Sequence, residues 1–266
     1  MKSGGFLRNL KLWIVIFLII SIILVYKYTM PYYNELQLHQ KTKQLYAGIA
    51  GDNIDWEIIA QTEAGNTIYI KKFGDGDEIT LILAALHGDE QTGFHLVYRL
   101  ADTLASQPEI IRKPAVIVPV VNPDGLLARS RLNAEGIDVN RNFPTKNWSP
   151  VYEQEKYYPG SQSGSALETQ VMMLLINKYK PVKIIAVHDD LHMNNFDGPA
   201  ENLAWKMAET NGYEVTSDVG YPTPGSLGSY AGIEKNIAVI TLELPRISPE
   251  EAWRDNFQAL IDAINF

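Results

Sequence analysis

The sequence LILAALHGDEQTG, residues 81–93, combines a short apolar run with a polar turn. An apolar run of about four to eight residues that ends in a glycine-containing turn is typical of a buried strand in an α/β sheet. The turn places His87 and Glu90 at the carboxyl end of that strand, where open α/β sheets bind their ligands. An imidazole and a carboxylate this close can hold one metal ion, but a catalytic zinc site needs a third protein ligand. Because H-x-x-E alone also occurs in surface turns, the rest of the chain must supply that ligand.

Composition limits the possible classes of protein. The chain has 266 residues, 46% of them hydrophobic, which suffices for one sizeable core in a single α/β domain. The formal net charge is -8, and the body of the chain has no dense basic patch, so nucleic acid is not expected as a partner. The chain contains no cysteine, which excludes disulfides, thiolate zinc ligands and a thiol nucleophile.

The N-terminal region has a different composition from the rest. Residues 12–26 read LWIVIFLIISIILVY and are apolar except for Ser21. With their flanks they are long enough to cross a thin hydrocarbon core, so we predict a transmembrane anchor over residues 12–28. The alternative is a cleaved signal peptide, but residues 27–32 offer no small-residue cleavage site.

The charges around this run predict its orientation. Three basic residues precede the run, Lys2, Arg8 and Lys11, whereas only Lys27 follows immediately. The positive-inside rule then places the N-terminus, residues 1–11, in the cytoplasm. On the other side of the membrane we expect a stalk at 29–44 and a catalytic domain at 45–266. We therefore expect a single-pass protein of the inner (cytoplasmic) membrane, with its catalytic domain on the extracytoplasmic, periplasmic side.

Apolar runs and turn signals predict the elements of the domain. We expect strands at 54–59, 67–73, 115–121, 184–187 and 237–242, in addition to the strand that precedes His87. Helices are expected at 93–106 and 249–266. A turn is expected at 122–125, which reads NPDG.

The loop at 129–144, RSRLNAEGIDVNRNFP, carries three arginines. In an acidic chain, clustered guanidinium groups next to a metal-binding turn favour recognition of a carboxylate or an oxyanion. This loop, together with HGDE at 87–90 and NPDG at 122–125, resembles the zinc carboxypeptidase family. The resemblance implies a single α/β domain with a mixed, mostly parallel twisted sheet and helices on both faces, and one zinc ion per chain.

Carried over residue by residue, the resemblance also implies roles for five side chains. His87 and Glu90 would bind zinc, Arg131 would polarise the scissile carbonyl and hold the oxyanion, and Asn140 with Arg141 would bind a substrate carboxylate. Arg129 is a weaker candidate for the role of Arg131, because Arg131 has the position of the motif relative to Asn140.

The family's third zinc ligand is a histidine at the end of a later strand. The β-branched run at 184–187 ends in His188, which we predict to be that ligand. His192 follows four residues later, and H-x-x-x-H on a helix would be a rival zinc motif. Asn194, Asp197 and the following glycine and proline make a helix here unfavourable, so His188 is preferred.

The proton-transfer group should be a carboxylate, since a zinc-bound water needs a base to accept its proton. Glu243 ends the apolar run at 237–242, and a buried glutamate in such a place is costly without a partner or a catalytic role. Its position resembles that of the family's catalytic glutamate. Tyr221, in a loop rich in proline and glycine, resembles the family's substrate-capping tyrosine.

Three further segments resemble the murein peptide amidase branch of the family: 197–200, 223–226 and 243–245. This branch cleaves the γ-D-glutamyl-diaminopimelate amide of peptidoglycan stem peptides. Because diaminopimelate carries carboxylates, Arg141 and Arg246 are expected to contact the substrate.

We therefore expect a membrane-anchored zinc metallopeptidase whose partner is a peptidoglycan stem peptide or another peptide. Three alternatives stay open. The chain could be a general metallocarboxypeptidase that releases C-terminal amino acids, an N-acyl amino acid deacylase, or an anchored cell-wall-binding module without activity.

Overall fold

A computed structural model describes residues 3–266 of the chain, with side-chain surroundings from residue 10 onward. The chain divides into two compact units, Met1–Leu45 and Tyr46–Phe266. A long helix, α1 (Ser3–Gly48), contains the N-terminal apolar run. The stretch Leu10–Gly51 is long and apolar enough to cross a membrane. A signal sequence near an N-terminus also meets these criteria of length and composition. Lys2, part of the predicted segment 1–11, lies outside the described residues, and the predicted domain boundaries stay predictions.

The second unit contains one eight-stranded sheet with the order β1-β2-β4-β3-β5-β8-β6-β7. Its strands are β1 (Glu57–Gln61), β2 (Thr67–Phe73), β3 (Thr80–Ala84), β4 (Ala115–Val118), β5 (Lys183–Asp189), β6 (Met193–Asp197), β7 (Glu214–Thr216) and β8 (Ala238–Leu244). The central strands β4, β3, β5 and β8 run parallel to one another, as do β6 and β7, whereas β1–β2, β2–β4 and β6–β8 are antiparallel pairs. The predicted mixed, mostly parallel sheet is therefore confirmed.

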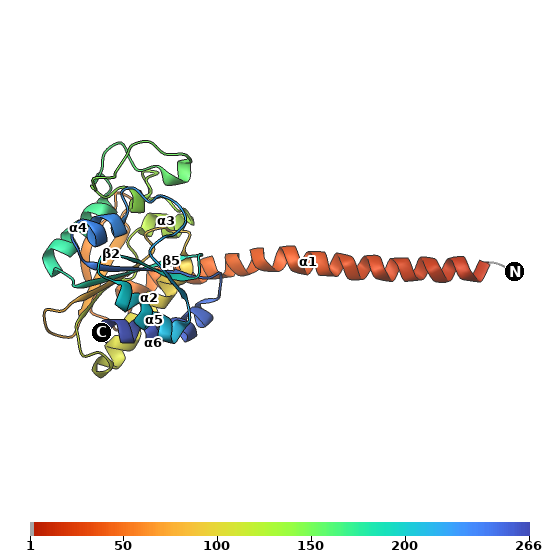
Figure 1. Ribbon diagram of the computed structural model, residues 1–266. Helices are drawn as coiled ribbons and strands as arrows, with labels where there is room; N and C mark the ends of the chain where they lie inside the picture. The colour runs from red at the N-terminus through yellow and green to blue at the C-terminus, as the bar shows by residue number, and fades with distance from the viewer. Residues whose placement is uncertain (1–2) are drawn as a thin grey trace. The chain divides into compact units, whose positions relative to one another are not determined.

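Helices cover both faces of this sheet (Figure 1). The α-helices are α2 (Gln91–Ser106), α3 (Pro123–Ala128), α4 (Leu167–Tyr179), α5 (Glu201–Asn211) and α6 (Pro249–Asn265). Short 3-10 turns occur at Ile49–Gly51, Pro108–Ile110, Val139–Arg141 and Glu155–Tyr157, and η5 (Gly228–Ile233) is a π-helix. Helices α2, α5 and α6 pack on one face, and α4 with η5 packs on the other.

The alternation of side chains along β3 explains why both faces are covered. Leu81 and Leu83 point into the core under α4, whereas Ile82 and Ala84 point into the core under α2 and α6. All five residues of β3 are fully buried. A central parallel strand must be apolar on both sides, which is why it appears in the sequence as an uninterrupted apolar run.

The structure differs from the predicted elements in several places, among them β4, which ends at Val118 rather than at residue 121. The NPDG segment, predicted as a turn, begins helix α3, because the side chain of Asn122 accepts a hydrogen bond from Gly125 N and Pro123 occupies the first turn. The strand predicted at 54–59 begins only at Glu57, since Ile54 N donates to the Asp52 side chain instead. Among the α-helices and strands, four had no prediction from the sequence: α4, β6, α5 and β7.

The turn after β3 packs tightly against the start of α3. A Cβ atom at Gly88 would lie 1.9 Å from the carbonyl carbon of Gly125 and 2.1 Å from Leu126 N. Only glycine permits this approach of two backbones. The close packing holds the His87 turn against the segment after β4, at the carboxyl edge of the sheet.

Candidate metal centre

Three neighbouring parallel strands deliver the predicted chemistry to one edge of the sheet. His87 and Glu90 follow β3, His188 lies near the end of β5, and Glu243 lies near the end of β8. Strand β5 lies between β3 and β8, and His188 is in register with Glu243. Since parallel strands end at the same edge, residues far apart in the sequence meet there.

The side chains of His87, Glu90 and His188 converge on one point. Nδ1 of His87 lies 2.7 Å from Oε1 of Glu90, and Nδ1 of His188 lies 2.7 Å from Oε2 of the same carboxylate. The two Nδ1 atoms are 3.2 Å apart, and ligand atoms of all three residues lie within 4.8 Å of one another. All three residues are buried. Their ligand atoms are therefore placed to hold one metal ion.

The donor set fits zinc. Two imidazole nitrogens and one carboxylate oxygen are the ligands of a known class of catalytic zinc site, in which the fourth position stays open. The arrangement also favours a bound cation. The buried carboxylate of Glu90 needs a positive partner, and a cation between the two facing imidazole nitrogens would supply one.

Asp138 orients this cluster from behind, a role that was not assigned from the sequence. Its Oδ1 lies 3.2 Å from Nε2 of His87, and its Oδ2 accepts hydrogen bonds from Nε and Nη2 of Arg131 at 3.0 and 2.9 Å. The side chain of Asp138 is fully buried. Metal-binding histidines commonly bond a carboxylate through the second ring nitrogen, which fixes the ring. In the sequence, the only indication of this role was the position of Asp138 within the motif at 131–144.

The electrostatics of the cluster suit a cation. Burial lowers the pKa of His87, but Glu90 and Asp138 outweigh burial and raise it to about 9. Burial raises the pKa of Glu90, but His87 and His188 outweigh this effect and hold it well below its usual range. The pKa of Asp138 is lowered in the same way by His87 and Arg131, against burial. Both carboxylates are therefore ionised at neutral pH.

Glu243 stands beside this cluster without belonging to it. The residue is buried, and its Oε2 has no hydrogen-bond partner among the described residues. Burial raises the pKa of Glu243, and the neighbouring His188 opposes that rise in part. A carboxylate with a raised pKa and a free oxygen is suited to taking and returning a proton.

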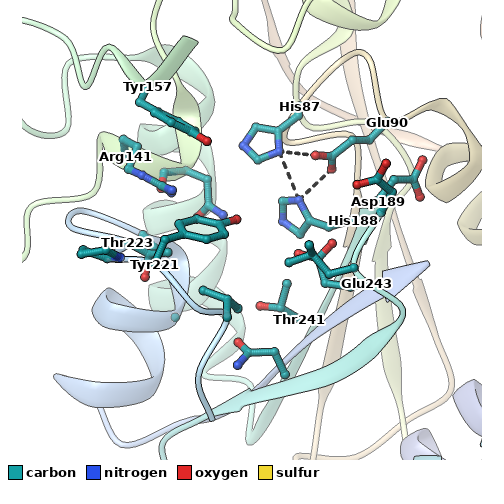
Figure 2. A pocket seen from close by; sticks show the side chains of 18 of the residues that line it. His87, Glu90, Arg141, Tyr157, His188, Asp189, Tyr221, Thr223, Thr241 and Glu243 are labelled. Carbon is teal, nitrogen blue, oxygen red and sulfur yellow. Dashed lines mark hydrogen bonds and ion pairs between the residues drawn. The ribbon is translucent and has the colours of Figure 1, made fainter. Parts of the chain in front are cut away.

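Eight of the nine predicted site residues line one cavity of about 450 Å³: His87, Glu90, Arg131, Asn140, Arg141, His188, Tyr221 and Glu243. Figure 2 shows the His87, Glu90 and His188 cluster on one wall, with Arg141, Tyr157 and Tyr221 on the wall opposite. The cavity therefore has a wall with the candidate metal cluster, which faces a wall that carries a cation and two aromatic rings.

Arg131 and Arg141 differ in their pairing. Arg131 Nη1 lies 3.7 Å from Oε1 of Glu90, and Asp138 holds the rest of its guanidinium group. Arg141 is buried and donates from Nη1 to its neighbour's backbone, Asn140 O, at 2.8 Å. Among the described residues, no carboxylate forms an ion pair with Arg141, so its charge is available to a ligand.

The remaining predictions have mixed outcomes. The side chain of Asn140 accepts a hydrogen bond from Leu227 N at 2.8 Å, so it also fixes the loop after Tyr221. Arg246 does not line the cavity and forms an ion pair with Asp190, which does. His192 packs its ring against Tyr213 at 4.4 Å and is outside the metal cluster.

Tyr157, Asp189 and Asp197 also line the cavity but were not singled out from the sequence. The guanidinium carbons of Arg131 and Arg141 both lie 5.4 Å from the centre of the Tyr157 ring. Burial raises the pKa of Asp189 well above its usual range, and Glu90 and Glu243 raise it further. A half-buried tyrosine in a short 3-10 turn and an aspartate after His188 carry no periodic signal, which is why sequence patterns do not reveal them.

The variant Asp138→Asn tests the orienting role. We expect zinc affinity to fall roughly 10- to 100-fold, as is typical when the partner of a metal-binding histidine is changed. Competition with a fluorescent chelator measures this. Glu168→Gln is the matched control, because Glu168 is also buried and is bonded to Asn133, away from the cluster. Equal zinc affinity in the two variants would contradict the role of Asp138.

Comparison with known proteins places this site in a family. The model of the zinc carboxypeptidase family matches residues 50–196. Murein peptide amidase A of Escherichia coli K12 is 35% identical over 189 residues, which cover 66% of this chain and 74% of the relative. The protein of the same name from Vibrio campbellii is 33% identical over 196 residues, which cover 68% and 76%.

Solved structures give the same result. The murein-tripeptide amidase of Escherichia coli O157 superposes with a TM-score of 0.69 at 29% identity, covering 81% of this chain and 94% of that one. Bovine thrombin-activatable fibrinolysis inhibitor shares the fold with a TM-score of 0.67 at 17% identity, covering 86% and 93%. His87, Glu90 and His188 provide the donor atoms that a zinc site needs. From the family match and these relatives, the chain belongs to the zinc carboxypeptidase family and is a peptide-bond hydrolase.

Proposed function

We propose that this enzyme hydrolyses an amide bond of peptidoglycan stem peptides, and specifically the bond between γ-D-glutamate and diaminopimelate. The observation that carries the proposal is one cavity in which His87, Glu90 and His188 converge beside Glu243 (Figure 2). On the facing wall lies Arg141, which forms an ion pair with no carboxylate among the described residues. The similarity to proteins named murein peptide amidase supports the choice of substrate.

His87, Glu90 and His188 would hold the zinc ion. When bound there, zinc acts as a Lewis acid that makes water a stronger nucleophile and polarises a carbonyl group. Asp138 would keep the ring of His87 in place for that task, through the contact at Nε2.

Glu243 would accept a proton from the attacking water and return it to the leaving amine. Its buried, unpartnered Oε2 provides the position for that proton. Arg131 would donate hydrogen bonds to the oxyanion of the tetrahedral intermediate, since Asp138 holds its guanidinium group near Glu90. Both groups are fixed before substrate binds, so little reorganisation is needed.

Arg141 and Asn140 would orient the leaving part of the substrate. The guanidinium of Arg141 can bind a carboxylate with two parallel hydrogen bonds, and diaminopimelate offers carboxylates. Tyr221 is 44% exposed and lines the same cavity, so it would cover the bound substrate from solvent. The substrate role of Arg246 would be indirect, through Asp190 at the cavity wall.

We further propose that α1 anchors the enzyme in the inner membrane, with the catalytic domain on the extracytoplasmic side. The apolar run and the excess of basic residues before it support this orientation. Membranes from cells that produce the full chain should retain it after a carbonate wash. Release of a shortened chain would instead show a cleaved signal peptide.

A digestion assay tests the proposed reaction. The full chain in detergent should release diaminopimelate from a tripeptide with a γ-D-glutamyl-diaminopimelate bond, and a chelator should abolish the release. Mass spectrometry identifies the products. An α-linked peptide is the comparison, since faster cleavage of that peptide would favour a general metallocarboxypeptidase. An N-acyl amino acid should stay intact, and binding of wall fragments without any cleavage would favour a wall-binding module.

The variant Glu243→Gln tests the base. We expect zinc binding to be unchanged and kcat to fall by about 100-fold or more, because general base catalysis contributes roughly that factor. Metal analysis and steady-state kinetics measure the two quantities. Glu250→Gln, at an exposed position on α6, should behave as wild type. Full activity of Glu243→Gln would rule out the base assignment.

A further inference from the structure

A second hollow of about 510 Å³ adjoins the metal-centre cavity. The two share Arg141, Tyr157, Tyr221 and Pro222 as lining residues. Loop 146–163, green in Figure 1, supplies most of the rest of its lining, including Val151 and Tyr152. The shared residues make the two hollows continuous, so a substrate that fills the first can reach into the second.

The second hollow lies on the leaving-group side of the cavity. It is lined by Arg141 but by none of His87, Glu90, His188, Arg131 or Glu243. Figure 2 shows Arg141, Tyr157 and Tyr221 together on the wall that faces the metal cluster. Since Arg141 would bind the leaving part of the substrate, whatever lies beyond Arg141 is further along the chain on that side.

The lining of the second hollow is suited to apolar groups. Val151 is 80% exposed and Tyr152 is 38% exposed. Both line the hollow together with Pro159 and Pro224, and the polar residues Ser149, Glu153 and Gln154 complete its loop side. The ring of Tyr152 packs edge-on against Tyr158 with centroids 5.1 Å apart, so it is held in place. Apolar side chains held open beside an active site gain free energy when a ligand covers them.

Arg141 supplies the polar part of this subsite. Its guanidinium group has donors to spare, since within the described part of the chain it donates a hydrogen bond only to Asn140 O. Those donors can bind the carboxylate of a substrate that ends at the leaving residue. They can also donate to the carbonyl oxygen of an amide if the substrate continues, as a weaker hydrogen bond than that to a carboxylate.

We propose that the second hollow is a subsite for the residue that follows the leaving residue, a peptide-linked amino acid with a small apolar side chain. The enzyme would then accept stem peptides extended beyond the leaving residue as well as those that end there. This inference rests on the proposed function, because that function defines which residue leaves.

Paired substrates test this subsite. One pair is the γ-D-glutamyl-diaminopimelate tripeptide with and without one further alanine, and a second pair is an α-linked peptide with and without the same alanine. We expect the full-chain enzyme to cleave the extended and unextended peptides with kcat/KM values within about tenfold of each other. Val151→Ser and Tyr152→Ala should each lower kcat/KM for the extended peptide by roughly tenfold, the usual effect of losing a small apolar contact.

The same variants should change kcat/KM for the unextended peptide by less than about twofold, because neither residue lines the metal-centre cavity. Val182→Ser is the matched control, since Val182 is an exposed valine outside both hollows. A preference of more than about 100-fold for the unextended peptide, or an equal loss on both peptides, would overturn the subsite. If the enzyme cleaves only the α-linked peptides, the proposed function fails. The ratio of kcat/KM for the extended and unextended α-linked peptides would then still decide whether the subsite exists.

Discussion

The candidate active site, at the sheet edge where β3, β5 and β8 end, depends on one carboxylate buried between two imidazoles. Glu90 lies 2.7 Å from a ring nitrogen of both His87 and His188, two histidines 101 positions apart in the chain. An ionised carboxylate in the interior is costly unless it is paired, so Glu90 requires either a charged imidazole beside it or a metal ion shared with the two histidines. The parallel arrangement of β3, β5 and β8 makes this possible, because it brings their carboxyl ends to one edge. Without that register, Glu243 would not lie beside His188.

The fold class and most of the candidate site could be predicted from the sequence. Apolar runs reveal buried strands well, and His87, His188 and Glu243 each follow or end such a run, so their place at the sheet edge could be expected. Other residues carried weaker signals. Asp138 acts through two partners, His87 and Arg131, that only the folded chain brings to it. Arg246 was expected to contact the substrate because diaminopimelate carries carboxylates, but its side chain pairs with Asp190. Short strands at the sheet edge, such as β7 with three residues, are too brief for a periodic pattern.

The two walls of the cavity divide the work of the enzyme. The sheet edge carries the candidate metal cluster and Glu243, the proposed proton-transfer group, both on rigid strands and their adjoining turns. The facing wall is built from loops, which carry Arg141, Tyr157 and Tyr221 and continue into the second hollow. In α/β enzymes, the reacting groups usually lie on rigid elements, and the groups that recognise the substrate usually lie on loops. Under the proposed function, this arrangement would let the loop wall accept peptides of different length while the reacting groups stay fixed.

X-ray absorption at the zinc edge tests the central claim most directly, because it reports the atoms around the metal. The zinc-loaded chain should bind one zinc ion, with the scattering of two imidazoles and further oxygen ligands, all at about 2.0 to 2.2 Å. The variant His188→Ala should lose the signal of one imidazole. A spectrum without imidazole scattering in the wild-type chain, or one that does not change in His188→Ala, would show that the metal is not held by His87, Glu90 and His188.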